Sequence, residues 1–187
     1  MQYCIKDGKA NVTYPNGDTF SGTLANNKKI GSGKYQWSKQ KAIYEGNFHE
    51  DVIIGKGKFI YPDGSSYEEK NQHVVFFSGE WQNNQRHGQG TYIYSNGDSY
   101  SGEWVNGVKN GFGIYTYFSD HSQLVGNWEK NVYIDGKWRL HDNTEYHGSF
   151  NHNVPEGDGL FVFANGNQLE GSFTNKEFYT KKIVHNA

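Results

Sequence analysis

Large apolar residues alternate with polar residues along most of the chain, and glycine often takes an apolar position. In the segment SYSGEWV, polar residues separate Tyr100, Gly102 and Trp104. Because the side chains of a strand point alternately to its two faces, such a segment predicts a strand with one aromatic and one polar face. The aromatic-x-Gly-x-aromatic pattern recurs at about 23 residues, with one longer interval. Its glycines are Gly22, Gly46, Gly79, Gly102, Gly126, Gly148 and Gly171.

A second element follows these segments and contains Gly-x-Gly before alternating aromatic or aliphatic residues. Examples are GQGTYIY from Gly88 and GFGIYTY from Gly111, whereas GKANVTY from Gly8 and IDGKWRL from Ile134 each lack one of the two glycines. Asn-Gly or Asp-Gly pairs often come next, and they suit the positive φ angles of tight turns. Each repeat therefore predicts a β-hairpin.

Glycine and aromatic residues share one face of each predicted hairpin. Glycine leaves a flat surface on which a ring from a neighbouring strand can lie, and a larger side chain would displace that ring. Cross-strand aromatic pairs stabilise a sheet by roughly 0.2–1 kcal/mol each, which offsets the entropic cost of a strand glycine, about 0.5–1 kcal/mol. The predicted fold class is all-β, with an aromatic layer on one face.

The repeats predict one array over residues 1–175, with a degenerate insertion near 68–76. There, EEKNQHVVF separates two aromatic segments, which predicts a bulge or excursion from the sheet; a docking loop for a partner is the alternative. Residues 176–187 are expected to form a C-terminal cap or tail, because terminal repeats need a cover.

Composition and charge narrow the function further. Aromatic residues make up 17% of the 187 residues, which favours a folded chain. The formal net charge of -2 gives no general attraction to nucleic acid. The N-terminal residues lack the apolar run of a signal peptide, and a single cysteine, Cys4, excludes an internal disulfide. We expect an intracellular protein in a reducing compartment.

The residues that could carry chemistry lack the spacing of an active site. Gly-x-Gly also occurs in phosphate-binding loops, but no helical periodicity follows it here, so packing explains it better. The eight histidines have neither the i, i+2 nor the i, i+4 spacing of metal ligands. No nucleophile stands in a recognisable motif. We expect no enzyme activity, no cofactor and no metal.

The order Tyr-x-Gly-x-Trp, spacer, Gly-x-Gly and turn, repeated over residues 8–173, resembles the MORN (membrane occupation and recognition nexus) repeat family. The resemblance implies an elongated single-layer antiparallel meander of about seven MORN β-hairpin repeats. Within the family, the later repeats are similar to the radial spoke head proteins of cilia and flagella. The segments that carry this similarity are GQGTYIYSNGDSYSGEWVNG from Gly88, IDGKWRLHDNTEYHGSF from Ile134 and HNVPEGDGLFVF from His152.

This resemblance implies a non-catalytic scaffold for protein–protein interaction in the radial spoke head of the motile cilium axoneme. The implied partners are other radial spoke head subunits, or, in a homodimer or MORN pair, a second MORN chain. Aromatic side chains are the candidate contacts, because interfaces are rich in them. They are Tyr92, Tyr94, Trp104, Tyr115, Tyr117, Trp128 and Trp138.

The alternative function is a peripheral membrane or cytoskeletal adaptor that binds acidic phospholipids through its MORN repeats. Basic residues in the spacers before Gly-x-Gly would carry this binding, at about 1 kcal/mol each near an anionic surface. They are Lys28, Lys29, Arg86 and Lys109.

Overall fold

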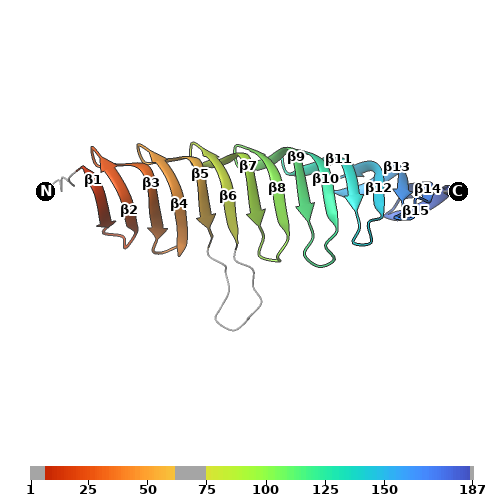
Figure 1. The fold of residues 1–187 in the computed structure, drawn as a ribbon, viewed down its shortest axis with the longest axis horizontal. Coiled ribbons are helices and arrows are strands. Elements are labelled where there is room, and N and C mark those ends of the chain that lie inside the picture. Colours follow the sequence, from red (N-terminus) through yellow and green to blue (C-terminus); the bar gives the residue numbers. More distant parts are fainter. Residues whose placement is uncertain (1–6, 62–74, 186–187) are drawn as a thin grey trace, which may run out of the picture. The chain divides into compact units, whose positions relative to one another are not determined.

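A computed structural model describes residues 7–61 and 75–185, which form strands and turns without a helix. The strands pair antiparallel in one open sheet whose order follows the chain, from β1 to β15 (Figure 1). The predicted all-β meander of hairpins is confirmed. None of the described residues belongs to a helix that could cross a membrane.

The strands have the following bounds. They are β1 (Gly8–Thr13), β2 (Thr19–Ala25), β3 (Lys28–Trp37), β4 (Ala42–His49), β5 (Val52–Ile60), β6 (Phe76–Gln82), β7 (Gln85–Ile93), β8 (Ser99–Val105), β9 (Val108–Thr116), β10 (Gln123–Glu129), β11 (Val132–Arg139), β12 (Glu145–Asn151), β13 (Val154–Val162), β14 (Gln168–Thr174) and β15 (Glu177–Val184).

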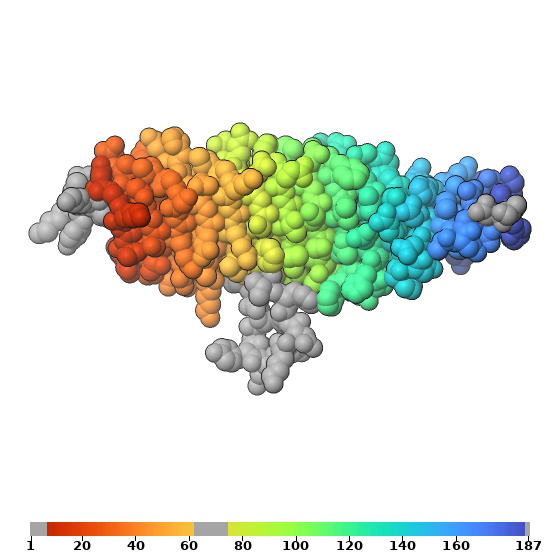
Figure 2. Space-filling model, viewed as in Figure 1, coloured from red at the N-terminus to blue at the C-terminus, as the bar shows by residue number. Residues whose placement is uncertain are grey.

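The chain divides into two compact units. Of the described residues, unit 1 contains 7–61, 75–97 and 104–107, and unit 2 contains 98–103 and 108–185. Unit 1 therefore holds β1 to β7 and the end of β8, whereas unit 2 holds the start of β8 and β9 to β15. Within each unit, side chains close the spaces between neighbouring strands (Figure 2).

Aromatic rings form the core of each unit on one face of the strands. In unit 1, the ring of Phe77 is fully buried and meets those of Trp81 and Trp104 edge to face, at centroid distances of 5.2 and 5.4 Å. In unit 2, Tyr100 meets Trp128 in the same way at 5.3 Å. This geometry is favourable for aromatic pairs and adds to the gain from burial. The predicted aromatic layer is therefore present in both units.

The two glycines of Gly-x-Gly have different structural roles. A Cβ on the second glycine would collide with a ring: on Gly33 it would lie 2.6 Å from Cε2 of Phe20. The first glycine instead forms part of a β-bulge. In the β6–β7 pair, Gly88 has a φ of 60°, and the register shifts between Gly79 and Glu80. The prediction that glycine makes room for rings therefore applies to the second glycine, whereas the first is required by its backbone conformation.

Two features of the sequence lie at or beyond the limits of the described residues. Cys4 lies outside them, and so does the predicted insertion near 68–76 except for its last two residues, of which Phe76 begins β6.

In the C-terminal segment, Glu177–Val184 forms β15 and pairs with β14. The sheet thus has one strand more than seven hairpins supply.

Candidate protein-binding site

In hairpin β10–β11, the ring that covers the paired glycines comes from the returning strand, as it does in β14–β15, where Phe178 lies against Gly171. Leu124 stands where Phe77, in β6, covers the paired glycines of its hairpin. In β10–β11 the ring comes instead from Tyr133 on β11, whose hydroxyl lies against Gly136. Tyr133 is fully buried, and its hydroxyl donates a hydrogen bond to the carbonyl of Val125 at 3.0 Å. Burial raises the pKa of Tyr133 far above its usual range.

The smaller Leu124 side chain lies in the wall of a hollow on the aromatic side of unit 2, with a volume of about 270 Å³. We call this site the aromatic hollow. Its apolar lining consists of Tyr117, Leu124, Trp138, Phe150, Val154 and Pro155. Its polar lining consists of Ser119, Asp120, Ser122 and Asn153. Apolar walls with a few polar groups are typical of binding sites.

The polar groups of the aromatic hollow give it a negative rim. The exposed carboxylate of Asp120 accepts the backbone N–H of Ser122 at 2.9 Å. This hydrogen bond holds the pKa of Asp120 below its usual range, so the group is ionised at neutral pH. In the wall, the buried indole N–H of Trp138 has no acceptor among the described residues. The hollow can therefore hold an apolar side chain beside a basic group.

Two of the seven aromatic candidates belong to the core. Trp104 and Trp128 are only 2% and 4% exposed. Their indole N–H groups donate to the carbonyls of Gly90, at 3.1 Å, and Gly113, at 3.3 Å. Both rings are therefore buried by packing within the chain.

The other five candidates are half-buried and occupy two positions of the repeat. Tyr92, Tyr115 and Trp138 follow the second glycine, and Tyr94 and Tyr117 stand at the ends of their hairpins. The ring of Tyr115 lies 5.0 Å from that of Tyr117. Among these residues, Tyr117 and Trp138 meet at the aromatic hollow.

Three of the four basic candidates lie over core rings. Lys29, Arg86 and Lys109 each occupy the second position of a returning strand. Their nearest ring centroids are those of Tyr35 at 5.4 Å, Trp104 at 4.4 Å and Trp128 at 4.3 Å. At such distances the cation is attracted by the face of the ring. These charges therefore contribute to the packing of the aromatic face.

Burial differs among the basic candidates. Lys109 is 9% exposed, and burial lowers its pKa to about 8. Lys28 is exposed and forms an ion pair of 2.9 Å with Glu50. The four residues thus do not form one open cationic surface.

The sequence interpretation missed two buried carboxylates in the turns. Asp18 accepts the hydroxyl of Tyr35 at 2.8 Å and the backbone N–H of Ser38 at 2.9 Å, and the Ser38 bond makes the largest contribution to lowering its pKa. Asp98 accepts the hydroxyl of Tyr115 at 2.6 Å. The sequence signal for these carboxylates was the triplet Asn-Gly-Asp, whose aspartate connects the turn to a tyrosine of the aromatic face by a hydrogen bond. In the described residues, no group of three His, Cys, Asp or Glu could hold a metal ion.

The fold and the repeat identify the class of protein. The model of the MORN repeat family matches residues 20–41, 44–66, 77–99, 100–121 and 146–168. These segments make up more than half of the chain, which therefore belongs to the MORN repeat family. The matches leave out residues 122–145, where β10 and β11 lie. MORN repeat proteins are in general non-enzymatic modules that interact with proteins or membranes.

Two known proteins are similar to this chain. MORN repeat-containing protein 3 of Xenopus laevis is 36% identical over 80 residues, which cover 43% of this chain and 32% of that protein. The matched region thus spans about a third of the relative's length. The TCP domain of SAS-4 (dCPAP) of Drosophila melanogaster, solved with a proline-rich motif of Ana2 (dSTIL), superposes with a TM-score of 0.49. The two are 16% identical, over 92% of this chain and 90% of that chain.

Proposed function

We propose that this protein is a non-catalytic scaffold that binds another protein at the aromatic hollow. The observation that carries the proposal is the hollow itself, where Leu124 stands in place of an aromatic ring and lies with Tyr117 and Trp138 around an open volume. Buried aromatic anchors dominate the energy of many protein interfaces. A partner fits this site if it inserts an apolar side chain and offers a basic group to Asp120.

The placement of the basic residues favours a protein partner over acidic phospholipids. Lys29, Arg86 and Lys109 have their charges over core rings. A lipid headgroup would have to compete with those rings, and the exposed member of the four candidates, Lys28, is already paired with Glu50. The lipid-binding adaptor is therefore the second hypothesis.

For the assembly in which the scaffold acts, we propose the radial spoke head of the motile cilium axoneme. The support is the similarity of the segments that begin at Gly88, Ile134 and His152 to radial spoke head proteins. The corresponding location is the axoneme of a cilium or flagellum, and the corresponding partners are other spoke head subunits.

Two exposed valines provide a matched test. Val154 is 38% exposed and lines the aromatic hollow, whereas Val105 is 37% exposed and lies outside it. The tagged full chain would be purified from ciliated cells as wild type, Val154→Arg and Val105→Arg, and bound proteins quantified by mass spectrometry. We expect spoke head subunits with wild type and Val105→Arg, and at least about tenfold less with Val154→Arg, the loss of a hot-spot contact.

The outcomes separate the parts of the proposal. Equal recovery with all three proteins would reject the aromatic hollow as the binding site. A different set of proteins, lost only with Val154→Arg, would reject the spoke head assignment and keep the scaffold. Sedimentation with phosphoinositide vesicles at physiological salt, abolished by Lys28→Gln, would favour the lipid hypothesis.

A further inference from the structure

The polar face of the sheet carries an apolar patch in unit 2. The middle residue of Gly-x-Gly is polar in the other copies. These residues are Ser32, Lys56, Gln89 and Asp158. In β9 this position is Phe112, whose side chain is 53% exposed. No ring contact of Phe112 is formed within the described part of the chain, and about half of its side chain is open to solvent.

Phe112 has two apolar neighbours on the same face. Ile114 lies two residues further along β9, and Val125 on β10 pairs with Ile114 in the ladder. The corresponding pair in β5–β6 is polar, Lys58 opposite Ser78. We call Phe112, Ile114 and Val125 the outer apolar patch. Phe112 is exposed, whereas Ile114 and Val125 are half-buried. Apolar side chains gathered on a polar face are typical of an interaction site.

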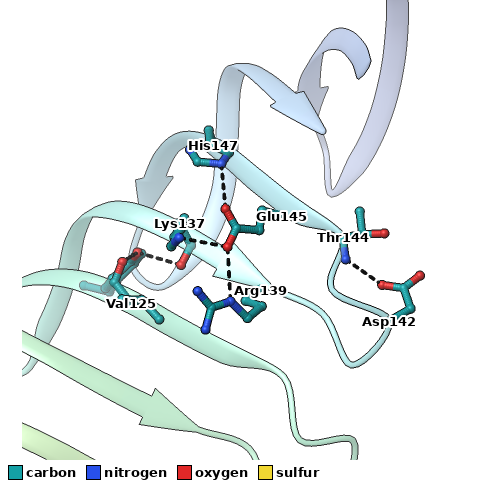
Figure 3. A network of polar contacts seen from close by, with 8 residues as sticks. Val125, Lys137, Arg139, Asp142, Thr144, Glu145 and His147 are labelled. Atoms are coloured by element: carbon teal, nitrogen blue, oxygen red, sulfur yellow. Dashed lines mark hydrogen bonds and ion pairs between the residues drawn. The ribbon is translucent and has the colours of Figure 1, made fainter. Parts of the chain in front are cut away.

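A basic cluster lies beside this patch. On β11, Lys137 pairs with Val125 in the ladder. Lys137, Arg139 and His147 surround the carboxylate of Glu145 (Figure 3). Lys137 Nζ and Arg139 Nε lie 2.8 and 3.1 Å from Oε1, and His147 Nε2 lies 3.1 Å from Oε2. Lys137 most strongly, and Arg139, hold the pKa of Glu145 below its usual range.

The cluster has more positive than negative charge. Lys137 and Arg139 are both charged at neutral pH, and Glu145 supplies the opposing carboxylate. The side chain of Arg139 is 40% exposed. Within the described residues its Nε–H is bonded to Glu145, and its terminal nitrogens point away from that carboxylate in Figure 3. Such a pair of N–H groups matches the geometry of a second carboxylate.

We propose that the outer apolar patch and Arg139 together bind a segment of a partner protein that carries an apolar side chain near an aspartate or glutamate. The apolar side chain covers Phe112 and Ile114, and the carboxylate binds the terminal nitrogens of Arg139. An anionic membrane is a poorer match, because the exposed carboxylate of Asp135 lies on the same face of β11 as Lys137. The patch and the aromatic hollow lie on opposite faces of the unit 2 strands, so this surface goes beyond the proposed function.

Photo-crosslinking tests the proposal with the full chain. The crosslinking amino acid p-benzoylphenylalanine would replace Phe112, or Gln89 as a control at the same repeat position, in cells that express the protein natively. Mass spectrometry would then identify the crosslinked segment. We expect a segment of another protein with an apolar residue close to Asp or Glu, at least about fivefold enriched over the Gln89 control. Crosslinks only to lipid, to a second copy of this chain, or at control level would overturn the proposal.

Binding of the identified segment, made as a synthetic peptide, gives the second measurement. Phe112→Ser introduces the residue that the first complete Gly-x-Gly carries at this position, Ser32, so the fold should tolerate it. We expect Phe112→Ser and Arg139→Gln each to weaken binding at least about tenfold, and added salt to weaken wild type more than Arg139→Gln. Lys56→Ser is the matched control and should bind as wild type. Unchanged affinity in either test variant, with melting temperatures preserved, would reject the proposed contact.

Discussion

Hairpins β6–β7 and β10–β11 each cover their paired glycines with an aromatic ring, but the ring comes from the first strand in β6–β7 and from the second strand in β10–β11. In β6–β7 of unit 1, Phe77 on β6 covers the paired glycines. Arg86 is the second residue of the returning strand β7 and lies over the ring of Phe77. In β10–β11 of unit 2, Tyr133 takes the position that corresponds to Arg86 and supplies the ring, while Leu124 takes the position of Phe77. Both hairpins thus bury a ring against glycine.

The comparison shows which part of the repeat is constrained by folding. A ring must lie on the glycine pair, but either strand of the hairpin can provide it. Moving the ring to Tyr133 leaves a smaller side chain at Leu124, in the wall of the aromatic hollow. The same hairpin also carries Val125 and, from the basic cluster, Lys137 and Arg139 on its other face. The least regular repeat therefore contributes to both candidate surfaces.

Truncating the ring of each hairpin should give the largest effect. We expect Phe77→Ala and Tyr133→Ala to lower the free energy of unfolding by about 3–5 kcal/mol each, because both remove a fully buried ring. At the exchanged positions, Arg86→Ala should lower it by about 2 kcal/mol or less, and Leu124→Ala by about 2–3 kcal/mol, because Leu124 is buried but borders the hollow. Urea denaturation monitored by tryptophan fluorescence measures all four. If Leu124→Ala cost as much as Tyr133→Ala, the exchange of roles between the strands would be wrong.

Alanine at the two glycines of one motif should separate their roles. In Gly90→Ala the new Cβ would lie 2.5 Å from Cε2 of Phe77, and displacing that ring should cost about 2–3 kcal/mol. Gly88 has a φ of 60° and faces the flexible side chain of Glu80, so Gly88→Ala should cost about 1–2 kcal/mol through backbone strain. Gly88→Asn should recover part of this loss, since asparagine tolerates that conformation. An equal loss in Gly88→Ala and Gly88→Asn would contradict the backbone explanation.

Lys109 should make stability depend on pH. Burial lowers its pKa from the ordinary 10.5 to about 8, so between these values the unfolded chain binds more protons than the folded chain. Stability should therefore rise as pH increases from about 8 to 10.5. Relative to Lys109→Met, which has no such group, wild type should gain at least about 1 kcal/mol over this range. If the free energy of unfolding changed with pH equally in both proteins, the pKa of Lys109 would not be lowered in the folded chain, and the prediction would be wrong.

The strands, the hairpins and the aromatic face could be predicted because they depend on a local period of two and on turn residues. The role of Tyr133 could not be predicted, because it depends on which residue of β11 faces the glycine pair after the bulge. Lys109 resembled a solvated lysine in the spacer, and its burial follows from one ring on its own strand and two on the neighbouring strands. Tyr117 and Trp138 were predicted as separate contacts, and only the register of the strands between them brings them to one hollow.

The smallest effect is expected on the polar face of a regular hairpin. Lys34 and Glu45 pair across β3 and β4, with an ion pair of 2.7 Å and side chains that are 49% and 53% exposed. Exposed pairs of this kind contribute little because water and salt screen them, so Lys34→Gln should change the free energy of unfolding by less than about 0.5 kcal/mol. Urea denaturation at low and high salt would measure this change, with Lys9→Gln as a control for loss of a lysine alone. A loss above about 1 kcal/mol would mean that the polar face is constrained by folding. A small change supports the view that this face is free to vary, so that Phe112 reflects binding and not stability.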